Sequence, residues 1–244
     1  MIRFFVFFLA LCFALNACGE KEGKRFKKIP ATASGITFKN ELKDTPQLNI
    51  LTYLYYYNGA GVAAADFNND GLVDLYFTSN QGEDKLYLNK GNLKFEDITV
   101  TANIVNKDNW TTGVTHVDIN NDGLLDIYVC KVGNYLDIRG KNLLFINQGI
   151  NSDGIPTFKE EAAKYDLDFS GFSTQAAFFD YDLDGDLDMY LMNHSVHPNR
   201  NNGKGSLRME VDSLSGDRLY KNEGGKFVDV SAEVGIFQGG IGYG

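Results

Sequence analysis

Short apolar runs, separated by turns rich in Gly, Asn and Asp, recur along most of the chain. Runs of this length bounded by such turns predict β-strands. Each repeat begins with a small-residue strand, passes through an acidic loop to an apolar strand, and closes with two further strands. The predicted strands lie at 61–65, 75–78, 86–91 and 95–98, then at 113–117, 127–130, 144–149 and 158–161, and finally at 174–179, 189–192, 219–224 and 227–230.

The spacing of the repeats indicates a particular architecture. The acidic loops begin at residues 66, 118 and 180, so the periods are 118 − 66 = 52 and 180 − 118 = 62 residues. Four short strands in about fifty residues make one blade of a β-propeller. We therefore predict an all-β fold with a repeat region at 34–244. It contains three four-stranded blades near 59–104, 112–167 and 173–236, and the start of a further blade at 239–244. Propellers close with about four to eight blades, so we expect an incomplete ring and a fragment of a longer protein.

The acidic loops are the strongest candidates for a chemical role. In each nine-residue loop, Asp or Asn fills positions 1, 3, 5 and 9, and Gly fills position 6. Calcium takes about six to eight oxygen ligands, which alternate residues of a curled loop can supply, and glycine permits the left-handed backbone of the curl. We predict about three calcium ions, with these ligands: Asp66, Asn68, Asp70 and Asp74; Asp118, Asn120, Asp122 and Asp126; Asp180, Asp182, Asp184 and Asp188.

Two other interpretations of the loops are weaker. Asp, Asn and Gly also form plain turns between strands, but turn preference alone does not explain three loops with the same five positions filled. An EF-hand begins similarly, yet it needs a bidentate Glu at position 12 and flanking helices. Position 12 is Phe77, Val129 or Leu191, each inside an apolar run, so these loops are not EF-hands.

The repeats also resemble a known family. The acidic loops and two strand motifs together look like FG-GAP/VCBS repeats, the calcium-bearing blades also found in integrin α-subunit propellers. The strand motifs are Leu-Tyr-x-Asn-x-Gly at 86–91 and Phe-x-Asp at 95–97. The run Leu48–Gly59 resembles the entry segment of large VCBS-repeat lipoproteins of Bacteroidetes-type bacteria. The resemblance covers most of residues 34–244. It implies a calcium-binding propeller that serves as a binding, adhesion or scaffold module for a protein or glycan.

Charge and cysteine content narrow the possible partners. The net charge is −9, with 32 acidic residues, whereas nucleic-acid binding needs a basic face. We therefore expect no nucleic-acid partner. Cys130 lies in an apolar strand pattern, which predicts a small, inert core residue rather than a nucleophile.

The first residues predict export and lipid attachment. Arg3 precedes an uncharged apolar run that is too short to span a bilayer comfortably, so 1–17 is predicted to be a lipoprotein signal peptide. Leu15–Cys18 resembles a bacterial lipobox, which implies lipidation of Cys18 and a tether at 18–33. Gly19 then implies, by the same resemblance, an outer-membrane lipoprotein that faces the periplasm or the cell surface. An ordinary signal peptide with an incidental cysteine is the alternative.

Two further groups of residues have a candidate role. The segment 193–216 interrupts the third repeat and contains His194 and His197. Because no Cys or carboxylate cluster accompanies them, we expect a solvated loop rather than a metal site. Trp110 and Tyr53–Tyr57 offer aromatic surface for sugars, but packing between blades is the favoured interpretation.

Two functions are compatible with these features. The first is a membrane-anchored, calcium-binding propeller that recognises a protein or glycan. The alternative is an enzyme on the same scaffold, a glycan-active hydrolase or lyase with its site in a missing C-terminal part. The sequence contains no nucleophile elbow, zinc motif or phosphate loop, so binding is favoured.

The lipobox generates a direct test. Cys18→Ala is expected to release the protein from the membrane fraction and to abolish labelling by a radioactive fatty acid, because the substitution removes the acylated thiol. Stable anchoring needs more than one acyl chain, so we expect a triacylated terminus. Unchanged membrane association of the variant would contradict the lipoprotein assignment.

Overall fold

The computed structural model describes residues 26–106, 110–195, 210–236 and 239. The chain divides into two compact units, Met1–Pro30 and Ala31–Gly244. In the first unit, the described residues 26–30 have no regular secondary structure. The predicted signal peptide and Cys18 lie outside the described residues, as do His197 and 240–244 of the predicted further blade. No helix among the described residues is long and apolar enough to cross a membrane.

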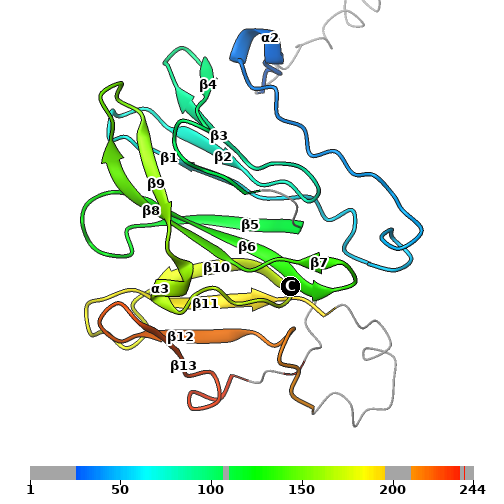
Figure 1. The fold of residues 1–244 in the computed structure, drawn as a ribbon. Coiled ribbons are helices and arrows are strands. Elements are labelled where there is room, and N and C mark those ends of the chain that lie inside the picture. The colour runs from blue at the N-terminus through cyan, green and yellow to red at the C-terminus, as the bar shows by residue number, and fades with distance from the viewer. Residues whose placement is uncertain (1–25, 107–109, 196–209, 237–238, 240–244) are drawn as a thin grey trace, which may run out of the picture. The chain divides into compact units, whose positions relative to one another are not determined.

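The described strands of Ala31–Gly244 form three antiparallel sheets (Figure 1). The first contains β1 (Val62–Ala65), β2 (Asp74–Phe77), β3 (Lys85–Asn89) and β4 (Phe95–Asp97). The second contains β5 (Trp110–Val117), β6 (Asp126–Tyr135), β8 (Leu143–Ile150) and β9 (Pro156–Glu160), and β7 (Ile138–Arg139) pairs with β6. The third contains β10 (Ser173–Phe179), β11 (Asp188–Asn193), β12 (Arg218–Asn222) and β13 (Phe227–Asp229).

These sheets confirm the predicted all-β fold with three four-stranded units, which we call the first, second and third blades. In each blade the strands follow chain order and pair as antiparallel neighbours. Within the described part of the chain the blades form an incomplete propeller and no closed ring. Strand β7 and two one-turn helices, α2 (Ala31–Ser34) and α3 (Ala162–Tyr165), were not predicted.

The innermost strands carry small residues because their backbones approach closely. Strand β5 contacts both β1 and β10. A Cβ atom on Gly113 would lie 2.2 Å from the Thr174 carbonyl oxygen and 2.3 Å from Gln175 Oε1. A Cβ atom on Gly61 would meet the Thr112 carbonyl oxygen at 3.0 Å. Larger side chains at either position would push the blades apart.

The second blade is buried on both faces, which explains its continuous apolar strand. In β6, Ile127 and Val129 pack in the core shared with the first blade, whereas Tyr128 and Cys130 pack in the core shared with the third. This alternation follows from the two-residue period of a strand. Burial raises the pKa of the Cys130 thiol, in agreement with its predicted role as an inert core residue.

A polar residue just before the third strand of each blade ties that strand to the second. Its Oδ1 accepts a backbone N–H from the second strand or from a residue shortly after that strand. The N–H of Ser79 donates to Asp84, that of Lys131 to Asn142, and that of Asn193 to Asp217, each at 2.8 Å. The aspartates also accept a tyrosine hydroxyl, from Tyr76 and Tyr190 respectively. Asn142 instead donates to the hydroxyl of Tyr128, which is itself a donor to the Leu167 carbonyl. The residue before the third strand is therefore Asp where the tyrosine hydroxyl donates to it, and Asn where the tyrosine hydroxyl accepts from it.

Candidate calcium-binding loops and an aromatic pocket

The three acidic loops share one backbone conformation. In each loop, positions 4 and 6 have positive φ. The values are 57° at Asn69 and 85° at Gly71, 57° at Asn121 and 84° at Gly123, and 63° at Leu183 and 99° at Gly185. The carboxylate at position 1 accepts the backbone N–H groups of positions 5 and 6; in the first loop these are bonds of 3.1 and 2.7 Å to Asp66. Asp118 and Asp180 accept the equivalent bonds. The glycine therefore has the left-handed conformation predicted for it.

The carboxylate at position 9 joins the loop to the third strand of its blade. Asp74 Oδ2 accepts the N–H of Phe67 at 3.0 Å, and Oδ1 accepts the N–H of Asn89 at 2.8 Å. Asp126 and Asp188 make the same pair of bonds, with Asn147 and Asn222 as the third-strand partners. We call this arrangement the aspartate clamp. Sequence reasoning noted the recurring Asn of the third strand as part of a motif but did not assign it this partner.

The clamp carboxylates lie in a desolvated and negatively charged environment. Asp74 and Asp126 are fully buried. Burial, and to a smaller extent the charges of positions 5 and 1, Asp70 and Asp66 in the first loop, raise the pKa of each carboxyl group to about 6. Two backbone N–H donors oppose this shift without cancelling it. A nearby cation would stabilise the ionised carboxylates.

The structure brings some of the predicted ligands together. In the third loop, oxygen atoms of Asp180, Asp182 and Asp188 all lie within 4.8 Å of one another; this group does not include Asp184, which is exposed. In the first loop, the Asn68 amide donates to Asp70 Oδ2 at 3.0 Å, so positions 3 and 5 face each other. Asn120 and Asp122 do the same in the second loop.

Three buried oxygens in these loops have no hydrogen-bond partner among the described residues; one is Asp186 Oδ1, at position 7 of the third loop, and the other two belong to predicted ligands. These two are Asn68 Oδ1 and Asp182 Oδ1, both at position 3 of their loops. A buried oxygen without a partner is costly, and a cation between positions 1, 3 and 9 would satisfy the oxygen at position 3. The donor set consists of carboxylate and amide oxygens, the ligands that calcium prefers. The residues therefore fit a calcium ion.

The third loop contains a cation of its own. The Lys221 ammonium lies 2.5 Å from Asp182 Oδ2 and 3.9 Å from Asp184 Oδ2. The hydrogen bond from Lys221 lowers the pKa of Asp182. The equivalent positions in the other blades are Leu88 and Ile146, which are buried in the cores. A calcium ion in the third loop would therefore compete with Lys221.

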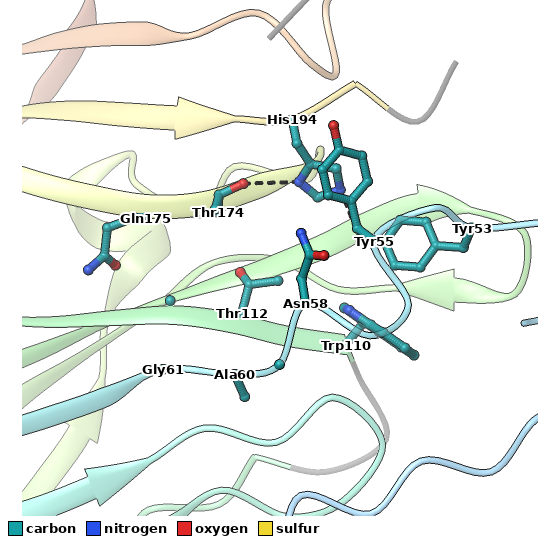
Figure 2. A pocket seen from close by; sticks show the side chains of 12 residues that line it. Tyr53, Tyr55, Asn58, Ala60, Gly61, Trp110, Thr112, Thr174, Gln175 and His194 are labelled. Atoms are coloured by element: carbon teal, nitrogen blue, oxygen red, sulfur yellow. Dashed lines mark hydrogen bonds between the residues drawn. The ribbon is translucent and has the colours of Figure 1, made fainter. Parts of the chain in front are cut away.

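A pocket lies at the opposite ends of the inner strands, where β1, β5 and β10 begin (Figure 2). Its cavity volume is about 310 Å³. Its lining includes the rings of Tyr53, Tyr55, Trp110 and His194. We call it the aromatic pocket. Tyr53 and Trp110 pack edge to face, with ring centroids 5.3 Å apart, so the segment before the first blade packs against the start of the second blade.

The location of His194 corrects a prediction. We expected it in a solvated loop, but it directly follows β11 and is only 2% exposed. Its Nε2 is hydrogen-bonded to the Tyr53 hydroxyl at 2.8 Å, and its Nδ1 to Thr174 Oγ1 at 3.0 Å. Burial lowers its pKa to about 4, so the imidazole is neutral at pH 7. The contact with Tyr53 spans 141 residues of sequence, and no local signal reveals it.

Comparison with known proteins finds a similar repeat. A family model described as an FG-GAP-like repeat matches residues 66–129, which include the first two acidic loops. Cartilage acidic protein 1 from Xenopus tropicalis is 31% identical over 140 residues, or 56% of this chain and 21% of that protein. The human protein of the same name is 30% identical over 137 residues, covering 55% of this chain and 20% of that protein. The matched part thus spans about a fifth of the length of these relatives.

The buried His194 predicts a specific pH dependence of stability. Between pH 6.5 and 4 the unfolded chain binds a proton at this residue and the folded protein does not, so the free energy of unfolding falls as the pH decreases through this range. The full loss is about 3 kcal/mol. Chemical denaturation of His194→Gln from pH 7 to 4 is expected to show a shallower decline than the wild type.

His116→Gln is the matched control, because His116 is exposed on β5. It is expected to keep the wild-type profile. A decline in His194→Gln as steep as in the wild type would contradict the assigned role of His194.

Proposed function

We propose that this chain is a calcium-stabilised, β-propeller-type binding module, attached to the outer membrane through Cys18 and directed to a protein or glycan ligand. The observation that carries the proposal is the repeated geometry of the acidic loops. Three loops have the same positions of positive φ and the same clamp, and two of them leave a buried oxygen at position 3 without a partner.

Calcium would have a structural role in this module. Each loop connects the innermost strand to the second strand, and its clamp reaches the third. Several carboxylates at one turn repel one another when ionised, so a bound cation would hold three strands of the blade in register. No step of catalysis is assigned to these loops, because their oxygens are engaged by backbone N–H groups and by the proposed ion.

The scaffold suits recognition. Rigid blades hold loops and strand ends in fixed positions, and such surfaces commonly carry binding sites. The match to an FG-GAP-like repeat supports a scaffold or binding module. The aromatic pocket offers a concave site at the ends of the strands remote from the acidic loops. The lipobox around Cys18 supports attachment to the outer membrane.

Removal of calcium tests the proposal. At a free concentration of ten times Kd each site would stabilise the fold by about 1.4 kcal/mol, and three sites by about 4 kcal/mol, against a total stability of about 5–15 kcal/mol. Chelation is therefore expected to lower the Tm measured by calorimetry. Magnesium is expected to restore it poorly, since it demands a tighter octahedral shell.

A count of bound calcium by equilibrium dialysis locates the sites. Asp182→Ala removes a carboxylate of the convergent group and is expected to lose one ion. Asp153→Ala is the matched control, because Asp153 is an exposed acidic residue of a turn outside the acidic loops. A melting curve that is indifferent to chelator, with no bound calcium, would reduce the acidic loops to turns.

The ammonium of Lys221 generates a second test. Lys221→Leu introduces the residue type of the first blade at this position and removes the competing cation. We expect the calcium affinity of the third loop to rise by up to about fivefold, the size of an exposed charge interaction, in a calorimetric titration. Lys226→Leu should leave the affinity unchanged, because the Lys226 ammonium pairs with Asp166 at 2.8 Å. An unchanged or weaker third site in Lys221→Leu would show that Lys221 does not compete.

A further inference from the structure

We propose that the aromatic pocket binds an uncharged sugar ring, with the face of the ring against Tyr55 and its hydroxyls on the carboxamides of Asn58 and Gln175. This inference rests on the proposed binding function and names its ligand class. The pocket involves none of the acidic-loop residues, and it lies at the other ends of the inner strands.

The floor of the pocket is built in advance. It is formed where the segment before β1 meets the beginnings of β5 and β10, at Gly61, Gly113 and Thr174. The Gly61 N–H donates to the Thr112 carbonyl at 2.8 Å. Because a Cβ atom on Gly113 would clash with the Thr174 carbonyl and with Gln175 Oε1, the glycine allows β10 and the Gln175 side chain to approach the backbone of β5 closely. A pre-formed cavity near the lower end of the usual range of about 300–1,000 Å³ suits a small ligand.

One wall of the pocket is aromatic. The half-buried ring of Tyr55 packs against two buried rings, with its centroid 6.0 Å from that of Tyr53 and 4.2 Å from that of His194 (Figure 2). The electron-rich face of an aromatic ring attracts polarised C–H groups. A sugar ring presents such groups on one face and hydroxyls around its edge. Because its neighbours hold Tyr55 in place, little side-chain entropy is lost on binding.

The polar groups of the lining match hydroxyls. Asn58 is exposed, and its side chain makes no hydrogen bond to another described residue. The side chain extends toward the centre of the lining (Figure 2). Gln175 is also exposed, and its amide makes one long bond of 3.4 Å to the Val114 carbonyl. A carboxamide offers both donors and an acceptor, which complements a hydroxyl that donates and accepts. Thr112 Oγ1 is already committed to the Ser173 carbonyl at 2.7 Å.

The part of the lining that the structure describes carries no charge at neutral pH. None of its twelve described residues is Asp, Glu, Lys or Arg, although the chain as a whole has a net charge of −9. Its one titratable base, His194, is neutral because burial lowers its pKa to about 4. A phosphate or carboxylate ligand would therefore be desolvated without a counter-charge, which is unfavourable. Of the ligands with both an apolar face and hydroxyls, a neutral sugar fits best.

The single tryptophan of the chain provides the readout. Trp110 lines the pocket and is the one Trp among the 244 residues, so its fluorescence reports on this site. The full chain in saturating calcium is titrated with glucose, galactose, mannose, N-acetylglucosamine and their β- and α-linked disaccharides, and in parallel with glucuronic acid and with short uncharged peptides. We expect saturable binding of at least one neutral sugar and none of glucuronic acid.

Variants locate the binding. Tyr55→Ala removes the stacking surface and Asn58→Ala removes a hydrogen-bonding group, so each is expected to raise the Kd of the neutral sugar by about tenfold or more. Tyr57→Ala is the matched control, because Tyr57 is on the same segment, is 60% exposed and lies outside the lining. Its Kd is expected to stay within about twofold of the wild type. Melting curves of all variants check that they fold, and Asn58→Ala tests the pocket independently if Tyr55→Ala does not fold.

Several results would overturn the inference: no fluorescence change with any neutral sugar, tighter binding of glucuronic acid or of a peptide, or an unchanged Kd in both pocket variants. These outcomes are separable from the calcium experiments. Sugar binding without any effect of chelator on Tm would leave the pocket assigned and reject calcium stabilisation. A chelator effect without sugar binding would reject the pocket ligand alone.

Discussion

A buried carboxylate at the last position of each acidic loop is the interaction on which every blade depends. Asp74 accepts one N–H from the start of its own loop and another from Asn89 on the third strand. A single side chain thus joins the end of the first strand, the start of the second and the third. A charged acceptor makes such bonds stronger than those between neutral groups. Burial of the carboxylate also has a cost, visible in the raised pKa of Asp74, and a cation in the same loop would offset it.

The clamp and the small residues of the inner strands together place two different surfaces at opposite ends of the blades. At one end, the acidic loops concentrate negative charge on turns with a fixed backbone. At the other, β5 approaches β1 and β10 closely, which Gly61 and Gly113 permit, and leaves a cavity that aromatic side chains line. The clamps at the first end join the strands of each blade, and the second end is hollowed by the aromatic pocket. The uncharged lining is separated from the acidic loops by the length of the inner strands.

The third blade follows the same plan with different local chemistry. Position 4 of its loop is Leu183, which has a φ of 63° and is 86% exposed, where the other loops have Asn. Left-handed backbone costs a branched side chain more than it costs Asn. Lys221 replaces a buried apolar residue and places an ammonium among the loop carboxylates. The three loops are therefore not equivalent, and the third is the one in which a protein cation already lies where a metal ion would bind.

The sequence by itself determined the all-β class, the four-strand repeat and the residues of the acidic loops, because these are set by local features: strand periodicity, turn residues and the spacing of oxygen side chains within nine residues. It did not determine the partner of each clamp, since Asn89 is brought to Asp74 only when β3 pairs with β2. It led to a wrong expectation for His194, whose burial depends on Tyr53, 141 residues away. The sequence also did not determine the partner of Lys131. This residue is buried within the apolar run of β6, and its ammonium donates a hydrogen bond to Asn106, which lies beside Asp84. Contacts between blades decide which side chains are desolvated, and only the tertiary structure brings those blades together.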